Sequence, residues 1–443
     1  MITPDKYSAA SVRELLEAAA RGKAAVDRRW LQAILERGEQ AVPEIVEFGT
    51  RQDDDDPIDI SWEIVCILYQ LASPAGVPWL IDYLRVEPDV PDHFIGALRR
   101  VRQHALEPLL ELYAGMEEDE AGEVAFCLAA LGVRDPRILG LLEDRLEYDL
   151  SEGAVALGLY GDPAARPALE RAMQDEQDQH LRRLLEDAVA ELGEPMSDAE
   201  HAVDLSEFFP EKALPQTEVL EDDDLVEMLV SSDPDYRLAA ADACIKSDMS
   251  DALEHAVLRT AREDNDDRVR ARCWEALGSA AADNEKIYNA LFSKLKDTAA
   301  PDVERAGALA GLGQLAAQDD IRPFVEQFYG NAATRAAAMS AMWNSLDRSY
   351  ATYFPQHLED PDPDVRKQAI SGVGYLGITD AADKLRTFFE DDEVRPNALF
   401  AYALSVRAEV SPARVRALLR KIDDTAKGLT EDEEELVKTA LDE

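Results

Sequence analysis

The chain has 443 residues and a formal net charge of −45, from 91 acidic and 46 basic side chains. It has no apolar run of about 18 residues and no charged, apolar, small-residue sequence at its start, which argues against a membrane span and a signal peptide. We therefore expect a cytoplasmic protein with no membrane partner.

The acidity is spread along the chain, and Arg outnumbers Lys by 34 to 12. Uniform acidity with few lysines is typical of a salt-rich cytosol, where a Debye length of about 3 Å near 1 M salt makes strong self-repulsion tolerable. A nucleic-acid mimic and a surface for cationic partners are the alternatives. We favour adaptation to salt, and thus a halophilic protein.

The first predicted elements are helices. Residues 1–50 are predicted to form an N-terminal helical capping region, in which Ser11 and Glu14 make a capping box. Residues 51–193 are predicted to form a first array of helical hairpins. Several of its first helices end in Leu-Gly, and glycine tolerates the left-handed conformation that follows a helix.

Residues 194–221 interrupt this rhythm with three prolines and eight acidic residues. We expect an acidic connector between two halves of the molecule. Phe208 and Phe209 are expected to pack and so to keep the connector ordered.

The second array, residues 222–426, carries the pattern Asp-x-x-(Val/Tyr)-Arg four times. The pairs are Asp233 and Arg237, Asp266 and Arg270, Asp362 and Arg366, and Asp391 and Arg395. Successive arginines lie 33, 96 and 29 residues apart, and the 96 equals three steps of 32 with weaker copies between. One unit therefore recurs about every 30 residues. The last segment, 427–443, is predicted to be an acidic C-terminal cap helix.

One repeat is clearest at residues 360–389. Small or apolar residues recur there at the spacing of a single helical face, and Ala and Gly dominate this face in other copies too. They are Val365, Ala369, Gly372, Val373 and Leu376. Small side chains let helix backbones approach closely, which favours a first helix packed between its neighbours. A short turn and a second helix rich in Leu and Phe complete the unit.

The recurring Asp is placed to cap the first helix by accepting hydrogen bonds from free amides. The recurring Arg near that helix N-terminus is opposed by the helix dipole by about 0.3–1 kcal/mol. Its recurrence predicts an acceptor, most simply the cap Asp of its own or the adjacent repeat. We predict a structural Asp/Arg ladder that joins successive repeats.

These features resemble HEAT repeats, in particular the HEAT-like repeats of the phycobilin lyase (PBS lyase) type. The resemblance is strong over 233–407 and weaker over 55–193, where the Arg is missing. It implies an all-α fold, an alpha-alpha superhelix in the form of a right-handed solenoid of helical hairpins.

The HEAT-like enzyme deoxyhypusine hydroxylase holds two irons with His-Glu pairs, which this sequence does not contain. The acidic groups Asp53 to Asp56, Asp222 to Asp224, and Asp360, Asp362 and Asp364 resemble cation ligands, but solvated residues at helix starts are the simpler interpretation. The four cysteines are expected to be small core residues. We predict no catalytic, metal or cofactor-binding residue, and leave a dispersed catalytic site open.

Three short basic groups are candidate nucleic-acid contacts. They are Arg99, Arg100 and Arg102; Arg182 and Arg183; and Arg414, Arg416, Arg420 and Lys421. Acidic residues surround each group, and binding that relies on counterion release weakens steeply as salt rises. We predict no nucleic-acid partner.

The favoured hypothesis is a non-catalytic protein–protein interaction scaffold that binds a partner of unknown identity on a concave row of second helices. The alternative is a HEAT-like enzyme or small-ligand binder related to bilin lyases. Aromatic residues of the second helices are the first candidates for partner contacts, although most are expected in the core. They are Trp79, Tyr83, Phe328, Tyr329, Tyr350 and Tyr353.

Overall fold

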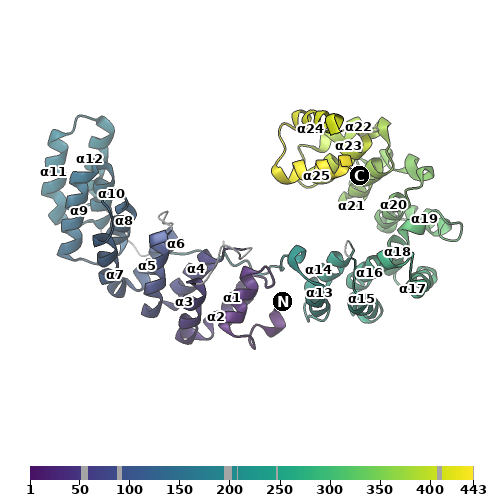
Figure 1. Ribbon diagram of the computed structural model, residues 1–443, viewed down its shortest axis with the longest axis horizontal. Coiled ribbons are helices and arrows are strands. Elements are labelled where there is room, and N and C mark those ends of the chain that lie inside the picture. The colour runs from purple at the N-terminus through teal and green to yellow at the C-terminus, as the bar shows by residue number, and fades with distance from the viewer. Residues whose placement is uncertain are drawn as a thin grey trace. The chain divides into compact units, whose positions relative to one another are not determined.

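The computed structural model describes residues 1–50, 58–86, 92–193, 202–206, 208–245, 248–406 and 412–442. The chain forms two compact units, Met1–Leu220 and Glu221–Glu443, whose helices Figure 1 labels. None of the described residues lies in a β-strand, which confirms the all-α prediction. Within the same ranges, no helix has the length and apolar character needed to cross a bilayer.

Unit 1 is a stack of helical hairpins. Its α-helices are α1 Val12–Ala20, α2 Arg28–Leu35, α3 Val42–Gly49, α4 Ser61–Leu71, α5 Val77–Val86, α6 Asp92–Arg100, α7 Arg102–Ala114, α8 Gly122–Ala130, α9 Pro136–Tyr148, α10 Leu150–Tyr160, α11 Arg166–Asp175 and α12 Gln179–Glu191. Its 3-10 helices are η1 Pro4–Lys6, η2 Gly38–Ala41, η3 Pro74–Gly76, η4 Pro163–Ala165 and η5 Thr217–Val219. The predicted capping box of Ser11 and Glu14 begins α1.

Unit 2 repeats the same plan. Its α-helices are α13 Asp222–Met228, α14 Pro234–Cys244, α15 Asp251–Glu263, α16 Asp267–Ala276, α17 Glu285–Lys296, α18 Asp302–Gly311, α19 Arg322–Tyr329, α20 Arg335–Asn344, α21 Pro363–Tyr375, α22 Thr379–Leu385, α23 Arg395–Val406, α24 Pro412–Ala426 and α25 Glu431–Asp442. Its 3-10 helices are η6 Leu277–Ala280, η7 Gly313–Leu315, η8 Ala332–Thr334, η9 Arg348–Tyr353, η10 Pro355–His357 and η11 Arg386–Phe388. Between α20 and α21, η9 and η10 stand where other repeats have a second α-helix.

One row of helices carries most of the packing along each array. In unit 1 this row is α4, α6, α8, α10 and α12, with α2 against α4; in unit 2 it is α14, α16, α18, α20, α21, α23 and α25. We call the latter the inner row. The structure is therefore a helical-repeat solenoid in each unit, as the periodicity of the sequence predicts.

The predicted small-residue face is the surface along which inner-row helices meet. A Cβ atom added to Gly307 of α18 would lie 2.1 Å from the backbone oxygen of Ala271 in α16. One added to Gly374 of α21 would lie 2.6 Å from the Cα of Ala401 in α23. Backbones this close leave no room for a side chain.

The second helices were predicted to form the concave side, and the structure shows that this prediction is wrong for unit 2. Within unit 2, the inner row lies on the inside of the curve and the second helices α15, α17, α19 and α22 lie outside it (Figure 1). The physical reason is spacing. Helices joined through Ala and Gly approach more closely than helices joined through Leu and Phe, so the array bends toward the small-residue row.

The predicted connector belongs to unit 1, because the boundary between the units falls after Leu220. Phe209 is fully buried and stacks on Trp30 of α2, with ring centroids 6.2 Å apart. The backbone amide of Gln216 donates to the carbonyl oxygen of Gly22 at 3.1 Å. The described part of the connector thus returns to the start of the array and packs there, which confirms the expected role of Phe209.

The four cysteines, Cys66, Cys127, Cys244 and Cys273, are buried and free, as expected of small core residues. Burial raises the pKa of the Cys66 and Cys244 thiols to about 12. These thiols are therefore protonated at neutral pH and unreactive.

Candidate interaction groove

The recurring arginines of unit 2 share one backbone contact. Each donates from its guanidinium to the carbonyl oxygen six residues earlier, near the end of the preceding helix or segment. The pairs are Arg237 with Ser231 at 2.9 Å, Arg270 with Asp264 at 2.6 Å, Arg335 with Tyr329 at 3.2 Å, Arg366 with Asp360 at 3.0 Å, and Arg395 with Phe389. The arginine therefore satisfies a carbonyl that the helix itself leaves free.

Three of these arginines also bind a carboxylate farther along the chain. Arg237 Nε lies 2.7 Å from Asp264 Oδ2, Arg270 Nε lies 2.9 Å from Glu304 Oε1, and Arg395 pairs with Glu433. Each contact joins one repeat to the next. These side chains hold successive repeats in register.

The acceptors differ from the predicted ones, because the four cap aspartates serve the helix amides instead. Asp233, Asp266 and Asp362 accept from the backbone amides two residues later, and Asp391 accepts from the amide of Glu393 at 3.2 Å. An aspartate that caps a helix faces its own amides, so the guanidinium four residues later reaches past it.

The Asp-x-x-(Val/Tyr)-Arg pattern does not include Arg335, because its repeat has Asn331 in place of the cap Asp. Asn331 still caps the helix, since its Oδ1 accepts from the amide of Ala333 at 3.1 Å. The signal in the sequence was an Arg four residues after a capping side chain.

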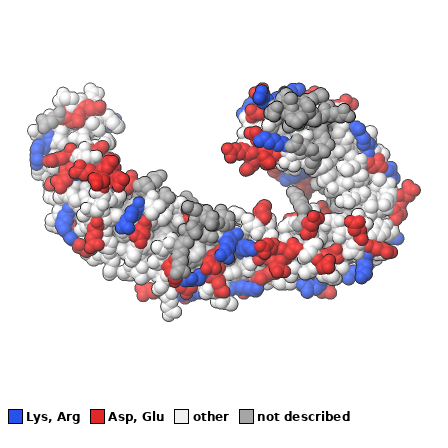
Figure 2. Space-filling model, viewed as in Figure 1, with Lys and Arg blue, Asp and Glu red and all other residues white. Residues whose placement is uncertain are grey.

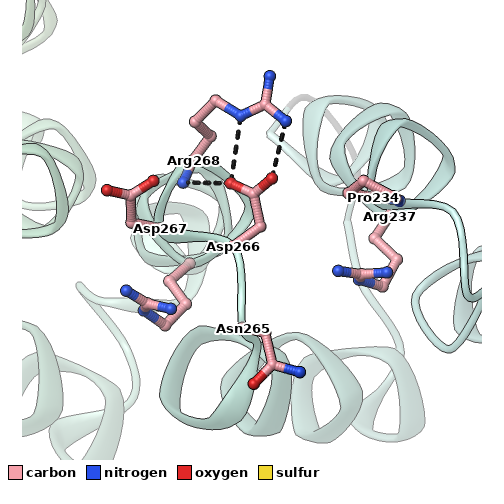
Figure 3. Close-up of a pocket in the computed structure, with 7 residues that line it drawn as sticks. Pro234, Arg237, Asn265, Asp266, Asp267 and Arg268 are labelled. Atoms are coloured by element: carbon pink, nitrogen blue, oxygen red, sulfur yellow. Dashed lines mark hydrogen bonds and ion pairs between the residues drawn. The ribbon is translucent and has the colours of Figure 1, made fainter.

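A shallow hollow of about 630 Å³ lies among these arginines at the start of α16. Figure 3 shows Arg268 bound to Asp266, and the Arg268 hydrogen bonds are the main cause that lowers the pKa of Asp266 to about 2. Arg237 and Arg270 also line it and are engaged as described above. An anion would have to displace carboxylates here. We therefore infer that the arginines of this hollow hold neighbouring repeats together and do not bind a ligand.

A larger groove of about 1420 Å³ runs along the concave side of unit 2. Its lining comes from the inner-row helices α14, α16, α20, α21, α23 and α25 and from the turns that follow α20 and α21. The groove is therefore lined by residues of several repeats.

An aromatic row crosses the groove. Trp343 of α20 stacks on Tyr375 of α21, with centroids 4.7 Å apart and planes 13° apart, and Phe400 of α23 lies 5.9 Å from Tyr375. Tyr375 is 39% exposed. The three residues lie on successive inner-row helices. The repeat pattern did not predict them because they fall outside the repeated small-residue face, and that position was their only signal.

Leu346 marks the edge of the same groove. It follows α20 with φ of 54°, and its side chain is 61% exposed. The corresponding turn after α21 uses Gly377, with φ of 59°. A leucine in the left-handed region is disfavoured by about 1–2 kcal/mol, and it exposes apolar surface.

The charged residues that the structure places on the groove lining are three cations and two acids. Arg272 binds both acids: it pairs with Asp242, and its Nη1 lies 2.7 Å from Glu275 Oε2. Burial raises the pKa of Glu275. The other two cations are Arg348 at the start of η9 and Lys367 in α21, the helix that carries Tyr375.

Half of the six aromatic residues proposed from the sequence are core, whereas most were expected to be. Trp79, Phe328 and Tyr350 are buried, whereas Tyr83, Tyr329 and Tyr353 are half-buried. They do not line the groove described above.

Several of the acidic side chains proposed as metal ligands accept hydrogen bonds from backbone amides instead. Asp222 accepts from the amide of Ser250, and Asp224 accepts from the amide of Glu221. Asp360 accepts from the amide of Asp362. Among the described residues no cluster of His, Cys, Asp and Glu has the arrangement of a metal site, and Asp53 to Asp56 lie outside those residues.

The candidate basic groups for nucleic-acid contacts are partly internal. Arg99 is buried and donates to the carbonyl oxygen of Ala130, and Arg100 donates to that of Tyr69. Arg182 pairs with Glu186. The side chains of Arg414 and Arg416 lie outside the described residues. Acidic side chains are spread over the visible face of both units (Figure 2).

A hydrogen-bonded chain of ionisable groups lies near η10. Tyr329 Oη is 2.7 Å from His357 Nε2, and His357 Nδ1 is 2.8 Å from Asp360 Oδ2. The hydrogen bond from His357 is the main cause that lowers the pKa of Asp360. The chain links α19 to the segment before α21, which is a structural use, although the same order of groups occurs in proton relays.

No protein-family model matches the chain, and no curated protein matches it significantly. Among solved structures it is similar to human deoxyhypusine hydroxylase in complex with glycerol, at 19% identity and a TM-score of 0.20 over 76% of this chain and 96% of that one. It is similar to a Kap121p mutant at 13% identity and a TM-score of 0.30 over 97% of this chain and 53% of that one, so it spans about half of Kap121p. A chain of the AP-3 complex gives 12% identity and a TM-score of 0.24 over 94% of this chain and 93% of that one. Scores this low carry no argument about function.

Proposed function

We propose that this chain is a non-catalytic scaffold or adaptor, built of HEAT-like repeats of the PBS lyase type, that binds a protein partner in a salt-rich cytosol. The groove of unit 2 is the binding surface. The single observation that supports this most is the aromatic row of Trp343, Tyr375 and Phe400 along that groove.

Exposed aromatic side chains are a characteristic of binding surfaces, because they bury a large area with little loss of conformational freedom. The groove lining also lacks a convergent pair of reactive groups among its described residues: its two acids are both bound to Arg272. A site that presents apolar surface without such groups favours binding over catalysis.

The test is affinity purification of the full chain from its own cells in molar KCl, as wild type, as Tyr375→Ser and as the control Tyr148→Ser. Tyr148 is an exposed aromatic residue of α9 outside the groove. A protein recovered in stoichiometric amount with wild type and Tyr148→Ser, and lost with Tyr375→Ser, supports the proposal. Recovery of no such protein, or equal recovery with all three, contradicts it.

The second candidate is a HEAT-like enzyme or small-ligand binder related to bilin lyases. The observation that favours it is the hydrogen-bonded chain of Tyr329, His357 and Asp360. Elemental and mass analysis of the purified chain, with and without His357→Ala, separates the two. A bound metal or small molecule that His357→Ala removes would favour the enzyme over the scaffold.

A further inference from the structure

We propose that the groove of unit 2 binds an extended peptide segment that carries both apolar and acidic side chains. Its apolar side chains would pack on the aromatic row, and its carboxylates would pair with Arg348 and Lys367. This inference rests on the proposed scaffold function and adds to it the chemistry of the partner.

The shape of the groove suits an extended chain. Most of its lining lies across the inner row from α14 to α23, and Leu436 of α25 adds one further contact. Packed helices lie about 8–10 Å apart. A strand that crosses several helices rises about 3.3 Å per residue, so about ten to fifteen residues would span the groove.

Apolar contacts are available at the end of the groove formed by α20, α21 and α23. The rings of Trp343, Tyr375 and Phe400 form a continuous surface there, and Leu346 stands at its edge. Leu346 keeps its side chain exposed at the cost of a left-handed backbone. Strain that is retained beside a surface of this kind indicates a binding role.

The charge of the groove selects an acidic partner. The whole chain has 91 acids and 46 bases, whereas the described lining has two acids and three cations. Both acids are bound to Arg272. The acid excess that covers the rest of the protein is therefore absent from this lining, and the net charge beside the aromatic row is positive.

Arg348 and Lys367 are the cations most available to a ligand, because Arg272 is held by two carboxylates. Arg348 is exposed and donates to the carbonyl oxygen of Gly377 at 3.3 Å, a contact that leaves most of its donors unused. Lys367 Nζ lies 3.0 Å from Glu393 Oε1, in a pair whose side chains are 36% and 56% exposed. Exposed pairs of this kind exchange partners easily because they contribute little.

Amide side chains add contacts suited to a peptide backbone. Gln368 accepts from Trp343 Nε1 at 2.7 Å, which leaves its own amide protons to donate, and the exposed Asn397 also lines the groove. An amide both donates and accepts, as a peptide group does. A nucleic acid fits less well, since its many phosphates would meet two cations on a chain of charge −45.

The test is selection of random peptides of about 12 residues by the immobilised full chain in molar KCl. The selected peptides are then labelled with fluorescein, and their dissociation constants are measured by anisotropy. We expect peptides that combine Asp or Glu with aromatic or aliphatic residues.

Two variants locate the binding. Arg348→Glu with Lys367→Glu should weaken it by about tenfold or more, because both contacts become repulsive. The matched control is Arg386→Glu with Lys427→Glu, which changes the net charge equally at exposed residues outside the groove and should leave binding unchanged. Tyr375→Ser should also weaken binding, and Tyr148→Ser should not.

The possible failures can be told apart. If basic or uncharged peptides are selected, or if charge reversal has no effect while Tyr375→Ser abolishes binding, this inference fails and the scaffold proposal stands. Competition by a single-stranded DNA oligonucleotide that requires Arg348 and Lys367 would also overturn it. If no peptide is selected, or if Tyr375→Ser binds as wild type does, both proposals fail.

Discussion

Arg270 of α16 binds Glu304 of α18 through two donors, with Nε at 2.9 Å and Nη2 at 2.7 Å from the same oxygen. The Glu304 side chain is only 4% exposed, and Lys294 Nζ lies 2.9 Å from its other oxygen. One carboxylate thus ties together two neighbouring inner-row helices and the second helix between them.

Removal of one partner should destabilise unit 2 strongly. Arg270→Ala leaves Glu304 buried with Lys294 alone, and we expect a loss of about 3 kcal/mol in the free energy of unfolding, as measured by urea titration. Arg268→Ala is the control, since Arg268 is 57% exposed, and it should cost less than about 1 kcal/mol. Equal losses in both variants would show that the Arg270 contact does not stabilise the stack.

The same contact should make stability depend on pH. Burial raises the pKa of Glu304, but hydrogen bonds from Arg270 and Lys294 outweigh it, so its pKa is lowered overall. A carboxyl with a lowered folded pKa stabilises the fold above its unfolded value of about 4.3, and this contribution is lost as the pH falls through the folded pKa. Glu304→Gln should therefore flatten the acid limb of the stability curve, and an unchanged slope would contradict this assignment.

Two glycines should respond to alanine in opposite ways. Gly307→Ala places a methyl group against the backbone of Ala271, and we expect a loss of about 1–3 kcal/mol from overpacking. Gly140 lies in α9 with no atom within 4 Å of an added Cβ, so Gly140→Ala should stabilise by up to about 1 kcal/mol. Thermal unfolding of both variants checks this. A stable Gly307→Ala protein would mean that the inner row is packed less closely than described.

Leu346→Gly should increase stability but weaken peptide binding. Glycine relieves the left-handed strain, and we expect a gain of about 0.5–1 kcal/mol after its greater freedom in the unfolded chain is allowed for. Loss of the exposed leucine should weaken binding of a groove-selected peptide. Ala72→Gly is the control, because Ala72 has φ of 49° in unit 1 and no part in the groove. Weaker binding in both variants would argue against a role for Leu346.

Salt should stabilise the protein. A charge of −45 repels itself across both units, and screening shortens the range of that repulsion to about 3 Å near 1 M salt. We expect the melting temperature to rise by several degrees from low to molar KCl. A flat response would show that the acidity serves another purpose than salt tolerance.

The sequence predicted the solenoid because stacking constrains it directly. Every first helix must fit between two neighbours, so its small residues recur and its caps recur with them. Asp266 and Asp362 could be recognised as caps for this reason. Glu304 could not be recognised as the acceptor for Arg270, because the contact depends on how two repeats are offset in space.

The concave side and the groove could not be predicted from the sequence, for a different reason. The direction of the curve depends on a difference in spacing between two rows of helices, and no single residue records it. Trp343, Tyr375 and Phe400 do not share one repeat position, since recognition of a partner requires no periodicity. The repeat pattern therefore favoured second-helix aromatics such as Tyr350, which is core.

The most direct test of the proposed binding surface is hydroxyl-radical footprinting of the full chain with and without a groove-selected peptide or a stoichiometric partner. Oxidation rates of Trp343, Tyr375 and Phe400 should fall together on binding, while that of the exposed Tyr148 should stay constant. Unchanged rates at these three rings, with protection appearing on the second helices α19 or α22 instead, would contradict the account.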